Sequence, residues 1–168
     1  GETVFAVAGA GVVDVVFNDG TGLNPAWIAR PAQEFHQDSA NVPDTAEVGD
    51  RMGAALAVGD FDNSRLGTIR DDLAIGIPGE DLEGIPTWVD VGAVMVIYSS
   101  GTNGLVAGTN TDLLVPRNPV GVTSAAGPGE QFGTVLAAGR FNSGSTEDLA
   151  WGAYGQRFDG VALRTGAT

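Results

Sequence analysis

The sequence predicts an all-β protein built from a repeated unit of short strands. Glycine makes up 26 of the 168 residues and proline another 8, and this glycine share is about twice the ~7% of average proteins. Such a composition favours tight turns between short segments over long helices. The apolar runs are only four or five residues long, are rich in β-branched side chains and end at Gly, Pro, Asp or Ser. Runs of this kind are typical of strands.

The chain repeats itself at a spacing of about 80 residues, most clearly between residues 49–76 and 129–152. Self-similarity at a fixed period is the mark of a repeat architecture. The pairs that align at an offset of 80 are Met52-Gly53 with Phe132-Gly133, Gly59 with Gly139, and Phe61 with Phe141. Residues 72–74 align with 148–150 at an offset of 76, so the first copy carries four extra residues in the connecting loop.

A second pair of segments repeats as well. Residues 92–98 align with 11–17 at an offset of 81, and each segment is followed by a Gly-Leu pair, Gly104-Leu105 and Gly22-Leu23. Both halves of the repeated unit therefore occur more than once in the chain.

Four strands are predicted in each unit, in a fixed order. In the complete unit the first strand covers 55–58, the second 73–77, the third 94–98, and an outer, more loosely alternating fourth strand 111–115. The preceding unit is expected to supply a second strand at 4–8, a third at 11–17 and an outer strand at 27–35. Four short antiparallel strands per repeat form the blade of a β-propeller. Another all-β repeat, or a sandwich, is the alternative.

These strands divide the chain into a partial blade at 1–35, a complete unit at 36–115 and a partial second unit at 116–168. One complete and two partial blades are too few to close a ring, because propellers close with about 4 to 8 blades. We therefore expect the chain to be a piece of a longer polypeptide, or to assemble with copies of itself or with another chain.

The motifs of the repeat resemble those of a known family. The second copy reads Phe132-Gly133, then Gly139-Arg140-Phe141-Asn142, then DLAWGA at 148–153; the first copy has Met52 in place of the Phe, then Gly59-Asp60-Phe61-Asp62, and then DLAIGIP at 72–78. This order resembles the FG-GAP repeat of integrin α chains and of bacterial or archaeal secreted proteins. The resemblance implies a β-propeller, a secreted or cell-surface location, and a role in adhesion, ligand binding or assembly.

The resemblance also implies a calcium site in the loop between the first and second strands. In the family, this loop has oxygen ligands at its first, third and fifth positions and an Asp just before the second strand. Asp60, Asp62, Ser64 and Asp72 occupy these positions here. Ca²⁺ takes about 6 to 8 oxygen ligands, and carboxylates two residues apart on a turn converge to supply them. Because Ser64 replaces an acid and the loop is longer, a solvated acidic turn is the alternative.

The corresponding loop of the second copy is not expected to bind calcium. Arg140 holds the first position, Asn142 the third, Gly144 the fifth and Asp148 the last. A guanidinium at a ligand position favours an ion pair over a metal, and we expect Arg140 to pair with Asp148.

Charge and composition exclude several kinds of function. The net charge is −13, and all 8 basic residues are Arg. The absence of Lys removes Schiff-base chemistry, and the acidic surface disfavours nucleic acid and anionic lipid. No Cys is present, so there is neither a disulfide nor a thiol nucleophile. No apolar run approaches the ~18 to 20 residues of a membrane span, and no membrane insertion is expected.

Catalytic motifs are weak. His36 is the only His, and although a relay could be drawn to Asp38 or Asp44, no GxSxG motif accompanies it. Paired acids such as Asp71-Asp72, Glu80-Asp81 and Glu83 are more often solvated loop residues than a glycosidase pair. We therefore expect that the chain is not an enzyme.

Ligand contacts are expected on the side of the blades opposite the calcium loops. The loops 79–90 and 37–48 lie there in integrin-like propellers, and the candidate contact residues are Asp81, Glu83 and Trp88. Aromatic side chains dominate interface energetics, although Trp88 could equally fold back over its own blade. The expected partner is a protein or glycan ligand, or neighbouring blades of the same or another chain.

Three functions are compatible with these features. The first is a non-catalytic, extracellular calcium-binding propeller module for adhesion, ligand binding or assembly. The second is an accessory propeller of a secreted enzyme whose catalytic residues lie outside this chain. The third is a structural subunit of an extracellular polymer, whose incomplete blades are completed by strand exchange.

Overall fold

The computed structural model describes residues 7–63, 70–82, 88–100, 104–108, 111–114 and 127–155. In these residues the regular structure is ten β-strands and no helix. The strands are β1 (Val13–Val15), β2 (Gln33–Phe35), β3 (Ala55–Gly59), β4 (Asp72–Ile77), β5 (Ala93–Ile97), β6 (Ser99–Ser100), β7 (Gly104–Leu105), β8 (Asp112–Leu114), β9 (Phe132–Gly139) and β10 (Asp148–Ala153). All pairs of these strands are antiparallel. The described part of the chain contains no helix long and apolar enough to cross a membrane.

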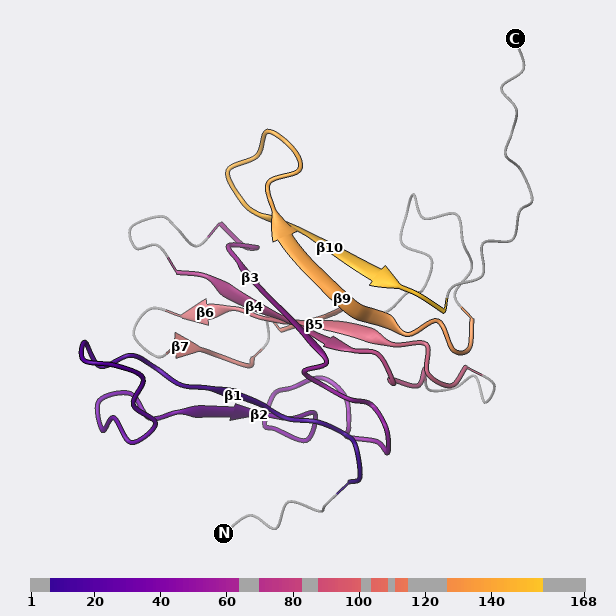
Figure 1. Ribbon diagram of the computed structural model, residues 1–168, viewed down its shortest axis with the longest axis horizontal. Helices are drawn as coiled ribbons and strands as arrows, with labels where there is room; N and C mark the ends of the chain where they lie inside the picture. The colour runs from indigo at the N-terminus through magenta and orange to yellow at the C-terminus, as the bar shows by residue number, and fades with distance from the viewer. Residues whose placement is uncertain are drawn as a thin grey trace.

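The strands are arranged in three layers (Figure 1). The middle layer is a four-stranded sheet in the order β3-β4-β5-β8, the pair β1-β2 lies on one side of it, and the pair β9-β10 lies on the other. The short pair β6-β7 extends from the end of β5. The N-terminal and C-terminal layers are thus separated by the central sheet.

Two apolar clusters hold the layers together. One lies between β1-β2 and the central sheet, and includes Val13 and Phe35 against Leu73, Ile75 and Ile97. The other lies between the central sheet and β9-β10, and includes Ala74 and Val94 against Phe132. Because both faces of the sheet are covered, every residue of β4 and β5 is buried. This explains why their sequences, apart from Asp72, are continuously apolar instead of alternating.

The repeat seen in the sequence is also a repeat of contacts. The N–H of Met52 donates to the carbonyl of Ala10 over 2.7 Å, and the aligned N–H of Phe132 donates to Val91 over 2.8 Å. The same holds for Gly49 to Ala8 and Gly129 to Val89, and for Gly79 to Asp50 and Gly155 to Glu130. Parallel bridges join Gly11 to Met52 and Gly92 to Phe132. One layer therefore meets the next in the same way twice.

The expected strands of the complete unit are confirmed, and so is the all-β fold with antiparallel strands. The described strands form stacked layers without a closed ring. The outer strands are shorter than expected, because 27–30 is a turn and only Gln33–Phe35 pairs with β1. Of the strand expected at 4–8, residues 7 and 8 are not in a strand and the rest lie outside the described residues. The pair β6-β7 was not expected.

Candidate metal centre

Three carboxylates meet where β3 ends and β4 begins. One oxygen from each of Asp60, Asp62 and Asp72 lies within 4.8 Å of the other two. Asp60 and Asp72 are buried, whereas Asp62 is exposed. Asp72 joins this cluster although the loop carries four additional residues. Ser64, the other expected ligand, lies outside the described residues.

Asp72 is held in place by the main chain on two sides. One carboxylate oxygen accepts the N–H of Phe61 over 2.8 Å, and the other accepts the N–H of Ser99 over 2.9 Å. Burial raises the pKa of Asp72, and the charge of Asp62 acts in the same direction. Each carboxylate oxygen carries two lone pairs, so both oxygens can still serve as metal ligands.

The loop of Asp60 is fastened to the C-terminal layer. The N–H of Asp60 donates to the Glu147 carboxylate over 2.8 Å, and the N–H of Glu147 donates to the Asp60 carbonyl over 2.9 Å. Sequence reasoning missed Glu147, because its contact with Asp60 spans 87 positions. The candidate centre therefore sits at a junction between two layers.

The second copy of the loop closes without an acidic cluster. Asp148 accepts the N–H of Phe141 over 2.8 Å, as Asp72 accepts that of Phe61, and its other oxygen accepts the Asn142 amide over 2.6 Å. The expected pair of Arg140 with Asp148 is wrong, because Arg140 lies 3.3 Å from Glu147 instead. The Asn142 amide satisfies Asp148 directly, so the guanidinium is not needed there.

Asp81 and Trp88 lie in the loop between β4 and β5, at the opposite end of the central sheet from Asp60 and Asp72. Asp81 accepts the N–H of Asp90 over 2.8 Å, and the carbonyl of Trp88 accepts the N–H of Leu82 over 3.2 Å. Both contacts close the loop on itself. Glu83 lies outside the described residues.

A second acidic cluster is buried at this end of the sheet, and it includes Glu80, which was expected to be a solvated loop residue. Glu80 is 2% exposed and accepts the amide of Gln37 over 2.6 Å. Burial raises the pKa of Glu80 to about 9, with the Asp44 carboxyl contributing. Burial also raises the pKa of Asp50, which accepts the N–H of Glu47. The only signal in the sequence was that Asp50 and Glu130 align at an offset of 80.

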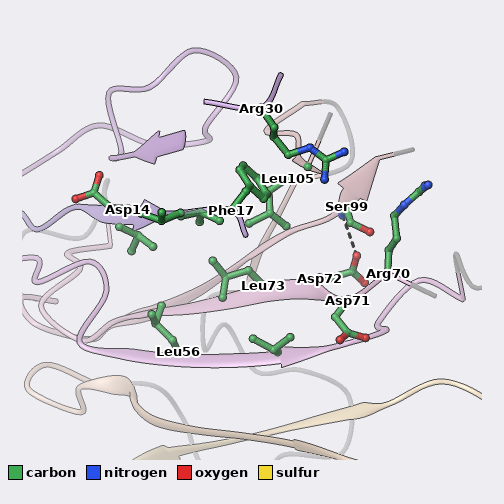
Figure 2. A pocket seen from close by; sticks show the side chains of 15 residues that line it. Asp14, Phe17, Arg30, Leu56, Arg70, Asp71, Asp72, Leu73, Ser99 and Leu105 are labelled. Carbon is green, nitrogen blue, oxygen red and sulfur yellow. Dashed lines mark hydrogen bonds between the residues drawn. The ribbon is translucent and has the colours of Figure 1, made fainter. Parts of the chain in front are cut away.

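A largely apolar cavity of about 480 Å³ adjoins the candidate metal centre. Figure 2 shows Asp72 and Ser99 at one end, beside Asp71, and Leu56 and Leu73 along one wall. The opposite wall is formed by residues of β1 and those that follow it, 13–17. The cavity thus lies between the N-terminal layer and the edge of the central sheet.

The chain was also compared with known proteins. No protein-family model matches it, and no curated protein matches it either.

Proposed function

We propose that this chain is a non-catalytic, extracellular calcium-binding module of the FG-GAP propeller type, acting in adhesion, ligand binding or assembly. The observation that carries the proposal is the grouping of Asp60, Asp62 and Asp72, with one oxygen of each within 4.8 Å of the others. Hard divalent cations prefer carboxylate and carbonyl oxygens, and Ca²⁺ accepts the irregular geometry of a loop.

The two copies of the loop support a cation in the first and not in the second. Asn142 donates its amide to Asp148, whereas the aligned residue in the first copy, Asp62, carries a carboxylate. Two carboxylates at this separation repel each other unless a cation or an N–H donor offsets their charge. Asp60, Asp62 and Asp72 would hold the ion, which would supply positive charge and fix the loop.

The blade interpretation is supported by the middle layer and by the repeated contacts. The sheet β3-β4-β5-β8 has its strands in chain order, joined as an antiparallel meander. The N–H of Met52 and that of Phe132 make equivalent bonds to the preceding layer. Layers that repeat in this way are the building principle of a propeller.

Titration calorimetry with CaCl₂ on the chelator-treated chain tests the metal assignment. We expect saturable binding of one Ca²⁺ per chain that is lost in Asp60→Ala and retained in Asp148→Ala. The absence of binding to the wild-type chain would contradict the proposal, and so would equal loss in both variants.

A further inference from the structure

The two outer layers are complementary halves of the middle layer. In β9-β10 the opposed residues are Val135–Gly152, Leu136–Trp151, Ala137–Ala150 and Ala138–Leu149; in β3-β4 the aligned residues are opposed in the same order, Ala55–Gly76, Leu56–Ile75, Ala57–Ala74 and Val58–Leu73. The pair β1-β2 matches β5-β8 in the same manner, with Val13 opposite Phe35 as Val94 is opposite Leu114. Within the described residues, the C-terminal layer thus has the equivalents of β3 and β4, and the N-terminal layer has the equivalents of β5 and β8.

The outer face of β9-β10 exposes what the middle layer buries. On β3-β4, Ala57 is 8% exposed and Ala74 is 0% exposed, because the C-terminal layer covers them. Their counterparts on β9-β10 are Ala137 and Ala150, and both are exposed. Nothing in the described part of the chain covers this small-residue face.

The cavity beside β1 exposes side chains of the middle layer that correspond to those with which the C-terminal layer packs on the middle layer. Leu136, Ala138 and Leu149 are the side chains of the C-terminal layer that pack on the middle layer. Their counterparts on the middle layer are Leu56, Val58 and Leu73, which line the cavity (Figure 2). Leu56 is 50% exposed and Val58 is 59% exposed. The surface formed by Leu56, Val58 and Leu73, which by analogy packs against a face of small residues, is therefore exposed in the cavity.

We propose that the cavity is the docking site for the β9-β10 pair of a second copy of this chain. β10 of one copy adds to the edge of β1 that no described strand occupies in the next copy, in the register that β4 has with β5. Ala150 then lies opposite Val15, and Gly152 opposite Val13, as Ala74 lies opposite Val96 and Gly76 opposite Val94. The result is a complete four-stranded sheet shared by two copies.

The proposed contact continues an interface that the chain already contains. It is head-to-tail, so the same contact can repeat until a ring closes. Each copy contributes two four-stranded layers, and because propellers close with about 4 to 8 blades, rings of about two to four copies are expected. This assembly does not depend on the calcium assignment and can be tested in chelator.

Light scattering coupled to size exclusion, over a range of protein concentrations, tests the assembly. The wild-type chain is expected to form a discrete species of two to four times 17.1 kDa. Val58→Lys and Ala150→Lys should each give the 17.1 kDa monomer, whereas Ile28→Lys, at a residue 97% exposed and away from the cavity, should assemble normally. A wild-type chain that stays monomeric at the highest concentration overturns the proposal.

Mixing the two deficient variants separates a broken interface from a misfolded chain. The Val58→Lys variant keeps an intact β9-β10 face and the Ala150→Lys variant keeps an intact cavity, so the mixture should form dimers and nothing larger. A mixture that remains monomeric overturns the proposal. The register of β10 against β1 can be tested by disulfide cross-linking between introduced cysteines, since the chain has no Cys of its own. Ala150→Cys should cross-link to Val15→Cys of another copy and not to Glu34→Cys, and the reverse preference also overturns the proposal.

Discussion

At the residue scale, the first loop carries the carboxylate of Asp62 where the second loop carries the amide of Asn142. Asn142 donates its amide to Asp148 over 2.6 Å, and this bond needs no cation. The aligned Asp62 of the first loop has a carboxylate in place of this amide and so has no N–H to donate. We therefore expect this one side chain to determine whether the loop depends on a cation.

The first prediction is that Asp62→Asn makes the first loop independent of calcium. In chelator the melting temperature of this variant should exceed that of the wild type, because an amide donor to Asp72 replaces a repulsive carboxylate. The wild type should gain stability with calcium, by about 2.7 kcal/mol at a concentration 100-fold above Kd, and the variant should gain little. Differential scanning calorimetry measures both effects. Asn142→Asp is the matched reverse change, and stability unaffected by it in chelator would contradict this explanation.

The second prediction concerns the pH dependence caused by Glu80. The pKa of Glu80 rises from 4.5 to about 9 on folding, so the folded state holds this proton more tightly than the unfolded state. The resulting stability is fully present below pH 4.5 and is lost as the pH rises through about 9. Glu80→Gln mimics the protonated form, and it should flatten the decline in melting temperature between pH 6 and pH 9.

Burial raises the pKa of Asp50 and Glu130 as well, so part of the decline should persist in Glu80→Gln. The control is Glu34→Gln, at an exposed residue of β2. An unchanged profile in Glu80→Gln, or an equal change in both variants, would show that Glu80 does not carry the buried proton.

Residue identities alone could predict part of the site. Asp60, Asp62 and Asp72 were expected to lie together because the loop resembles that of the FG-GAP repeat, and one oxygen of each does lie within 4.8 Å of the others. The partner of Arg140 was predicted wrongly, because Asn142 satisfies Asp148 and leaves the guanidinium to Glu147. Contacts between layers, such as Glu147 with Asp60, depend on packing that no local pattern encodes.

At the element scale, the inner strands were predictable and the outer ones were not. Apart from Asp72, β4 and β5 are apolar throughout because both faces are covered, and their runs stand out in the sequence. The expected strand at 27–35 fails at its start, where the N–H of Trp27 donates to the Asn24 carbonyl and that of Arg30 donates to the Trp27 carbonyl. Local turn chemistry prevails there because an outer strand has little tertiary contact to oppose it.

The third prediction concerns the contact between successive layers at Gly92. A Cβ at Gly92 would lie 2.3 Å from the Phe132 carbonyl oxygen, and its φ is +85°. Gly92→Ala should therefore destabilise the chain by well over ~1 kcal/mol, measured by urea denaturation. Gly20→Ala is the control, since its φ is +95° but a Cβ there would meet nothing within 4 Å. Equal losses in the two variants would mean that backbone conformation, and not the layer contact, sets the cost.

At the scale of the whole molecule, the sequence predicted the repeat and the structure gives its physical meaning. An offset of about 80 residues between similar motifs corresponds to one layer meeting the next through equivalent hydrogen bonds, such as those of Met52 and Phe132. How the halves of the outer layers match could not be predicted. The match depends on which face of β9-β10 is exposed. The alternation of side chains along a strand identifies that face only once Leu136 and Leu149 are known to pack on the middle layer.

The close approaches of glycine to neighbouring backbone bear on how this molecule can diverge. A Cβ at Gly79 would lie 2.0 Å from the Gly49 carbonyl oxygen, and one at Gly155 would lie 1.8 Å from that of Gly129. Main-chain contacts therefore set the distance between layers, and the apolar side chains fill whatever space remains. The two copies of the repeat already differ in this way, since Met52 aligns with Phe132. Over evolutionary time, further core substitutions of this kind can accumulate while the glycines stay fixed. Relatives of this chain would then share a pattern of glycines more than a set of core residues.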